Sequence, residues 1–236
     1  MIPLRDANPT RRTALVTLAI VVACGIAFGW ELGVLARGDA AFAAAITEWG
    51  VVPGRLTAAW ERGDVLSFET VTLFSSQFLH GGWLHLLGNL LYLWIFGNNV
   101  EDRLGRVGFL LFYLTGGVVA GLAQVGIDPD SPIPTIGASG AIAATLGAYL
   151  VFFPGAKVTS LVFLGFFYQL VRVPAAFVLV VWFLLQLLDG IGSLGVSQSG
   201  GVAFFAHIGG FVFGAVVAWI LNLLGGGRQV RGIGVG

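Results

Sequence analysis

The run AHIGGFVFGAVVAWI, residues 206–220, is almost wholly apolar and carries a small residue at every fourth position. These small residues are Ala206, Gly210, Gly214 and Ala218. They share one face of a helix, and small residues at this spacing let two membrane helices approach closely. The surrounding apolar segment 202–224 is long enough to cross a bilayer, since a spanning helix needs about 20 apolar residues. The stretch therefore predicts a closely packed membrane helix.

The whole chain has the composition of an integral membrane protein. Hydrophobic residues make up 57% of it and charged residues 10%, whereas globular proteins average about 25% charged residues. Six segments are apolar enough to be candidate spans: 13–35, 82–99, 107–127, 136–153, 173–189 and 202–224. We therefore predict an all-α membrane protein, a bundle of six transmembrane helices with a long first outer loop at about 37–80. The zero formal net charge gives no indication of nucleic-acid binding.

Charged residues predict the orientation of this bundle. With the amino terminus in the cytosol, nine Arg and Lys residues fall on the inner side and three on the outer side, which fits the positive-inside rule. We predict both termini inside, with a cytosolic segment 1–12, a six-span domain 13–225 and a Gly-rich cytosolic tail 226–236. The apolar segment 154–172 is expected to form a re-entrant or interfacial hairpin, because another span would spoil the charge pattern.

Polar side chains are costly inside a membrane, so the few that are present are functional candidates. The three histidines, His80, His85 and His207, all lie near the outer start of a predicted span, and so does Ser139. Asn89 lies four residues after His85, so the two share one helix face. The pattern predicts that these side chains meet at one depth, just below the outer surface.

Ser139 stands in PTIGASGAIA, residues 134–143, between Gly137 and Gly140. Small residues recur every four positions from Gly140, so this helix can pack against the 206–220 face and bring Ser139 near His207. A base within hydrogen-bond distance activates a serine nucleophile. Free N–H groups at a helix start stabilise an oxyanion, and the Asn89 amide is a further donor.

Three other interpretations of these residues are possible. Ser139 and His207 can each be ordinary residues of helix packing, although four coincidences of depth speak against that. Three histidines can bind zinc, but no HExxH motif is present and no carboxylate lies near them in the spans, so we predict no metal and no cofactor. An ion pathway needs titratable groups through the full depth, and the inner halves of the spans carry almost none.

Together, these motifs resemble the rhomboid family of intramembrane serine proteases. The similarity covers HGGWLHLLGN from His80, VEDRLG from Val100, GASG from Gly137 and AHIGGFVFG from Ala206. The resemblance implies a six-span bundle in which a Ser–His dyad works. Its implied site residues are Ser139 as nucleophile, His207 as general base and then acid, His85, Asn89 and the Ser139 backbone as oxyanion donors, and His80, Gly137 and Gly140 as lining.

The resemblance also implies single-span or other membrane-protein substrates in the lipid bilayer, with the fifth span and the outer loop as gates. We expect a bacterial plasma (inner) membrane protein with its active site facing outward; the alternative is a catalytically silent rhomboid-like factor that binds or regulates membrane proteins. Two positions depart from the pattern of some members. Val71-Thr72 stands in place of Trp-Arg, and Ala143 stands in place of a tyrosine that stacks on the histidine.

Overall fold

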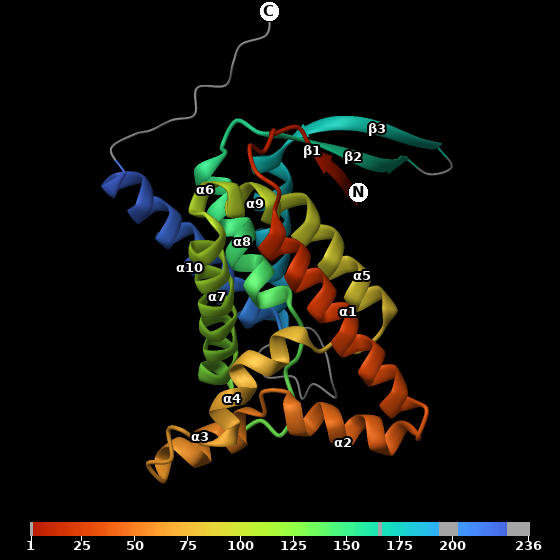
Figure 1. Ribbon diagram of the computed structural model, residues 1–236, viewed down its shortest axis with the longest axis vertical. Coiled ribbons are helices and arrows are strands. Elements are labelled where there is room, and N and C mark those ends of the chain that lie inside the picture. The colour runs from red at the N-terminus through yellow and green to blue at the C-terminus, as the bar shows by residue number, and fades with distance from the viewer. Residues whose placement is uncertain (1, 165–166, 194–202, 226–236) are drawn as a thin grey trace, which may run out of the picture.

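The computed structural model describes residues 2–164, 167–193 and 203–225 of the chain. They form a bundle of long helices with three short helices across one end and a small sheet across the other (Figure 1). We call these the α2–α4 end and the sheet end. The helices are α1 (Leu15–Leu35), α2 (Asp39–Trp49), α3 (Pro53–Glu61), α4 (Phe68–Ser75), η1 (Ser76–Phe78), α5 (Trp83–Tyr92), η2 (Leu93–Gly97), α6 (Asn98–Leu104), α7 (Arg106–Ile127), α8 (Ser139–Phe152), α9 (Ala175–Ser193) and α10 (Phe204–Leu224). The strands are β1 (Ile2–Asp6), β2 (Lys157–Leu164) and β3 (Phe167–Pro174).

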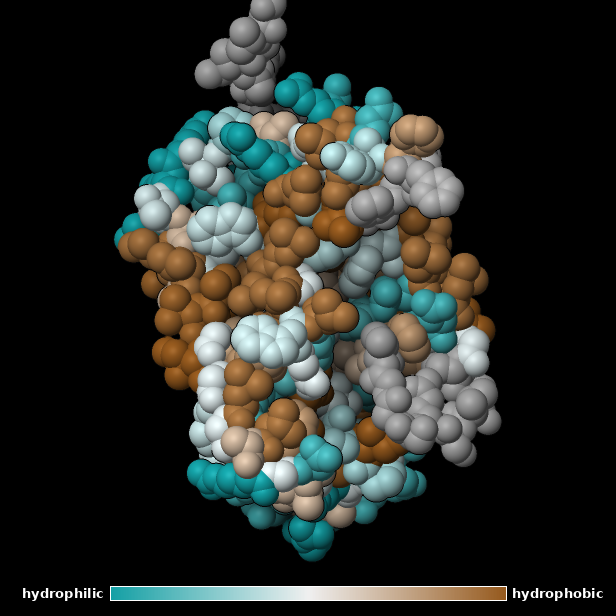
Figure 2. Space-filling model, turned by 90° about the vertical axis from the view of Figure 1, so that its right-hand side faces the viewer, coloured by the Kyte–Doolittle hydropathy of each residue, from teal (hydrophilic) through white to brown (hydrophobic). Residues whose placement is uncertain are grey.

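Four helices in the described part of the chain are long and apolar enough to cross a membrane: α1, α7, α9 and α10. The apolar helix α8 has only 14 residues, and α5 continues through the π-helical turn η2 into α6. Each of the six predicted segments contains helix, while the six-span count stays a prediction. Figure 2 shows apolar side chains across the middle of one face and polar side chains gathered at both ends.

Small residues let α8 pack backbone to backbone against α10, as the sequence predicted. A Cβ added to Gly214 would overlap the Ala144 carbonyl group, and one added to Gly210 would overlap the Gly140 carbonyl oxygen. The sequence did not predict that α7 joins this contact. A Cβ on Gly140 would lie only 2.6 Å from the Ala120 Cβ of α7, so α7 contacts α8 at this glycine through a single methyl group.

A buried carboxylate fixes the start of α1. Glu101 of α6 accepts hydrogen bonds from the backbone N–H groups of Val16 and Thr17, at 3.0 and 2.7 Å, and from the Thr17 hydroxyl at 2.8 Å. The first N–H groups of a helix have no intrahelical acceptor, and a negative charge there is stabilised by the helix dipole. This contact joins α1 to the run of α5, η2 and α6.

The segment 154–172 contains most of the antiparallel pair β2–β3, so the predicted hairpin form is confirmed, while its re-entrant or interfacial position stays a prediction. β1 pairs with β2 to give a sheet in the order β1-β2-β3, which the all-α prediction missed. The sequence carried a signal for it, since KVTSLVFL is rich in β-branched and apolar residues. Asp6 of β1 accepts hydrogen bonds from Asn99 and Tyr149, at 2.6 and 2.8 Å. Burial raises the pKa of the Asp6 carboxyl, while these hydrogen bonds oppose the rise.

Residues 37–80, predicted as a long outer loop, contain α2, α3, α4 and η1. Val51 and Thr135 exchange two backbone hydrogen bonds, of 3.0 and 2.8 Å. The segment is thus attached to the residues just before Ser139. The predicted tail 226–236 lies outside the described residues, and the predicted domain boundaries stay predictions.

Candidate active site

Ser139 and His207 are hydrogen bonded to one another, 68 positions apart in the sequence. Ser139 is the first residue of α8, and His207 lies in the first turn of α10. The distance from Ser139 Oγ to His207 Nε2 is 2.7 Å. Close packing of α8 on α10 brings the two helix starts together. The start of α10 is itself held by Gln124 of α7, whose side-chain oxygen accepts a hydrogen bond of 3.3 Å from the Ala206 N–H.

Two separate features require glycine at position 137, in the turn that leads to Ser139. Its φ of 125° is a conformation that L side chains rarely adopt. A Cβ at this position would also lie 2.7 Å from His85 Nε2. Its N–H donates a hydrogen bond of 2.9 Å to the Ser76 carbonyl oxygen. Glycine is therefore required where the chain turns into α8, and the turn is fixed to η1.

His85 presents a hydrogen-bond donor beside this turn. The Gly81 N–H donates to His85 Nδ1 at 3.3 Å. Nδ1 is therefore an acceptor, and in a neutral ring the proton must lie on Nε2, the atom nearest Gly137. Asn89, one helical turn further along α5, is 8% exposed, and its Nδ2 has no hydrogen-bond partner among the described residues. The first N–H groups of α8 have no acceptor within the helix. Together with the His85 and Asn89 groups, they form a set of donors suited to a negatively charged oxygen.

His80 is fully buried, and its ring contacts the ring of His85. The two rings pack edge to face with centroids 5.1 Å apart. The His80 backbone N–H donates to Glu31 Oε1 at 2.8 Å, and its Nδ1 lies 3.1 Å from the Phe78 carbonyl oxygen. A carboxylate of α1 therefore lies beside His80, contrary to the expectation from the sequence. Burial, followed by the neighbouring His85, lowers the pKa of His80 to about 4. The ring is therefore neutral at neutral pH and supports His85.

Two residues of α9 that sequence reasoning missed hold the other side of His207. Gln186 Oε1 lies 2.6 Å from His207 Nδ1, and the Trp182 ring lies 5.8 Å from the His207 ring, centroid to centroid. The sequence carried a signal, since Gln186 is a polar residue within an apolar span. Ala143 is fully buried in α8 and supplies no ring where some members carry a tyrosine. The ring beside His207 is that of Trp182, from α9.

The 37–80 segment is held on α7 without the Trp-Arg pair that some members carry. Gln77 donates hydrogen bonds to the carbonyl oxygens of Leu73 and Leu114, at 2.9 and 3.1 Å. A Cβ on Gly117 of α7 would overlap the Gln77 amide, so this glycine makes room for the anchor. Thr72 is buried and Val71 is half exposed.

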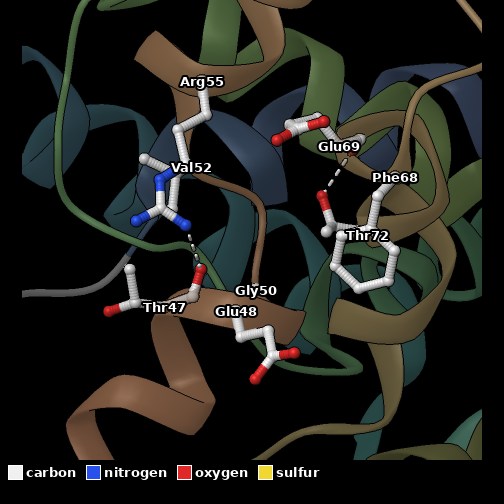
Figure 3. Close-up of a pocket in the computed structure, with 8 residues that line it drawn as sticks. All are labelled: Thr47, Glu48, Gly50, Val52, Arg55, Phe68, Glu69 and Thr72. Carbon is white, nitrogen blue, oxygen red and sulfur yellow. Dashed lines mark hydrogen bonds between the residues drawn. The ribbon is translucent and has the colours of Figure 1, made fainter.

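The same segment encloses a pocket of about 130 Å³ between α2, α3 and α4 (Figure 3). Arg55 reaches across it and donates to the Thr47 carbonyl oxygen at 3.4 Å. The pocket is lined by Thr47, Glu48, Gly50, Val52, Arg55, Phe68, Glu69 and Thr72. None of the predicted site residues lines it, so it is separate from the Ser139–His207 contact.

Comparison with known proteins supplies the family. A family model, the Rhomboid domain, matches residues 67–223. The chain belongs to the rhomboid family. Together with its four long apolar helices, this makes it an integral membrane protein.

This rhomboid resembles curated relatives over part of their length. It is 26% identical over 157 residues to Rhomboid protein 1, mitochondrial, of Saccharomyces cerevisiae, covering 64% of this chain and 42% of the relative. It is 40% identical over 92 residues to Rhomboid protease GluP of Bacillus subtilis, covering 39% of this chain and 18% of the relative. It is 32% identical over 75 residues to Rhomboid protease GlpG of Klebsiella pneumoniae, covering 32% and 27%. The chain spans about half or less of the length of the curated relatives it matches.

Proposed function

We propose that this rhomboid is an intramembrane serine endopeptidase that hydrolyses peptide bonds in or near transmembrane segments of membrane proteins. The observation that carries the proposal is the 2.7 Å contact between Ser139 Oγ and His207 Nε2. A hydroxyl hydrogen bonded to an imidazole is the minimum for an activated serine. Two relatives named as proteases add support.

The reaction follows from the placement of these two atoms. Ser139 Oγ attacks the carbonyl carbon of the scissile bond while its proton passes to His207 Nε2. The tetrahedral intermediate then collapses, the C–N bond breaks, and His207 Nε2 returns the proton to the leaving amine. In the second half, His207 takes a proton from a water molecule that attacks the acyl-enzyme, and Ser139 is released as the hydroxyl.

The negative charge of the intermediate falls on the former carbonyl oxygen. His85 Nε2–H, Asn89 Nδ2–H and the backbone N–H of Ser139 are the donors that would stabilise it. Asn89 Nδ2 has no partner in the described part of the chain, which supports this role, because a buried donor without an acceptor is costly unless a ligand uses it. Donors fixed before the reaction stabilise a transition state without having to reorganise.

We further propose that the site opens outward, with both chain termini in the cytosol. The proposal follows from the nine-to-three distribution of basic residues between the two sides. A site at the α2–α4 end would then receive water and substrate from the outer half of the bilayer. The substrates would be single-span or other membrane proteins, and the bilayer would be that of a bacterial plasma membrane.

The proposal is tested with purified protein in liposomes and a single-span reporter. Wild type is expected to give two fragments and to react with a fluorophosphonate at Ser139. Ser139→Ala and His207→Ala should abolish cleavage. Ser160→Ala is the control, because Ser160 is a buried serine that lies in β2, and it should cleave as wild type does.

The opposite result would support a different class of function. If clients bind to wild type without being cut, and Ser139→Ala binds them equally well, the chain is a non-catalytic membrane-protein binding factor. Cleavage by Ser139→Ala at the wild-type rate would overturn the dyad.

A further inference from the structure

Gln186 contacts the ring nitrogen of His207 that is not bonded to Ser139. Its side-chain oxygen lies 2.6 Å from His207 Nδ1, and an amide oxygen only accepts hydrogen bonds. Nδ1 therefore carries the proton, and Nε2 keeps the lone pair that faces Ser139 Oγ at 2.7 Å. The other tautomer would place an N–H against the serine hydroxyl and leave the serine without a base.

We propose that Gln186 is the positioning residue of this rhomboid and that the docking of α9 on α10 sets whether His207 can act as a base. The proposal rests on the proposed serine-protease function and deepens it. It replaces a two-residue unit by one of three residues, Ser139, His207 and Gln186. These come from α8, α10 and α9, so the third member belongs to a different helix from either reacting group.

A neutral amide suits this position. An ionised carboxylate within a membrane is expensive and needs partners of its own. The amide oxygen of Gln186 selects the same tautomer of His207 without adding a charge. Gln186 is half buried, so its oxygen reaches the imidazole while the rest of α9 remains largely exposed towards the surroundings of the bundle.

The attachment of α9 makes this contact adjustable. Aromatic side chains carry much of it: Phe183 stacks on Phe211 with centroids 4.6 Å apart, and Trp182 lies beside His207 and Phe211. Within an apolar stretch of 18 residues, 22% of α9 is buried inside the molecule, whereas the corresponding share for α7 is 39%. A hydrogen bond weakens steeply beyond its optimal distance and angle. A small displacement of α9 would therefore break the contact with Gln186 and leave Ser139 and His207 in place.

The first test replaces Gln186 by side chains of similar length in liposome-embedded protein. Gln186→Met removes the acceptor, Gln186→Glu keeps one, and Leu185→Met is the matched control on the exposed neighbour. We expect Gln186→Met to lower kcat and the rate of fluorophosphonate labelling of Ser139 by about tenfold, the value of one hydrogen bond, with KM unchanged. Gln186→Glu should stay within about threefold of wild type, since it also accepts a hydrogen bond.

A spectroscopic signature separates positioning from mere packing. The chain has three histidines, so ¹⁵N-histidine labelling gives few ring signals, and His80 and His85 serve as internal references. We expect His207 to carry its proton on Nδ1 in wild type and to populate both tautomers in Gln186→Met. The proposal is overturned if Gln186→Met keeps the wild-type tautomer and labelling rate. It is equally overturned if Met and Glu variants lose activity together with thermal stability.

The second test asks whether α9 acts through Gln186. Phe183→Ala loosens the stacking on Phe211 and should slow labelling in the wild-type background. In the Gln186→Met background the same change should add little, because residues that act as one unit are not additive. Full additivity would overturn the role of α9 docking. Absence of both labelling and cleavage in wild type would instead refute the protease function itself.

Discussion

The two helices that pack beside His207 are attached to α10 in opposite ways. α8 lies backbone to backbone against α10, because Gly140, Gly147, Gly210 and Gly214 leave no side chain between them. α9 meets α10 largely through rings, with Phe183 on Phe211 and Trp182 on His207. The first contact has no freedom to adjust, whereas the second consists of side chains that can repack.

The difference assigns different tasks to the two contacts. Ser139 and His207 start the two helices of the rigid contact, so their 2.7 Å separation is fixed by backbone geometry. Gln186, which selects the tautomer, comes through the adjustable contact. Precise placement of the reacting atoms and movement of a neighbouring helix can therefore coexist in one small bundle.

The largest effect is expected where the rigid contact is broken. Gly214→Leu would force a side chain into the Ala144 carbonyl group, and overpacking of a core costs about 1–3 kcal/mol, with more where backbone blocks the way. We expect cleavage to fall below detection and the thermal midpoint to drop together with it. Reporter cleavage and a thermal unfolding curve of the purified protein measure both.

The control places the same side chain on an open glycine. Gly29 of α1 is exposed and has no neighbour within 4 Å of an added Cβ. Gly29→Leu should therefore keep wild-type activity and stability. Normal activity in Gly214→Leu would show that the α8–α10 contact tolerates adjustment and would remove the basis of the comparison.

The sequence predicted the rigid contact far better than the adjustable one. Small residues every four positions indicate that a helix can approach another closely, so the α8–α10 pairing could be inferred from the repeats that begin at Gly140 and at Ala206. A side chain such as Gln186 carries no comparable sign of its partner, because its use depends on how α9 is turned. The composition of β2 favours a strand, but its pairing with β1 could not be predicted for a similar reason: the two segments lie about 150 residues apart, and no local pattern records their contact.

Phe183→Ala should loosen α9 alone. The ring is partly buried against Phe211, and removing it leaves a cavity whose cost is on the order of 1–2 kcal/mol for a partly buried ring. We expect amide hydrogen exchange in α9 to become about tenfold faster, since 1.4 kcal/mol corresponds to a factor of ten. Exchange in α8 should not change. Equal acceleration in both helices would mean that they open as one unit and would contradict the division drawn above.

Trp182→Ala should have a smaller effect that falls on activity. The indole lies beside the His207 ring at 5.8 Å, and an aromatic pair contributes about 0.5–1.5 kcal/mol beyond its buried area. We expect serine labelling to slow by about threefold to tenfold. Trp219→Ala is the control, because Trp219 lies on α10, as His207 does, and is 58% exposed. A greater loss in the control would show that the bilayer contact of α10 matters more than the ring beside His207.

The smallest effect is expected at the sheet end, where Asp6 contacts Tyr149 at the far end of α8. Burial raises the pKa of the Asp6 carboxyl in the folded protein above its ordinary value of 3.8. The folded state therefore binds the proton more tightly than the unfolded chain. The contribution of the Asp6 carboxyl to stability is fully present below that ordinary value and is lost as the pH rises through the raised pKa. Asp6→Asn, compared with wild type across this range by thermal unfolding, should flatten the decline. Serine labelling at neutral pH should stay unchanged, because the backbone contact of α8 with α10 holds Ser139 independently of the sheet. Slower labelling in this variant would show that the position of Ser139 depends on the sheet end and that the α8–α10 contact is less rigid than its geometry indicates.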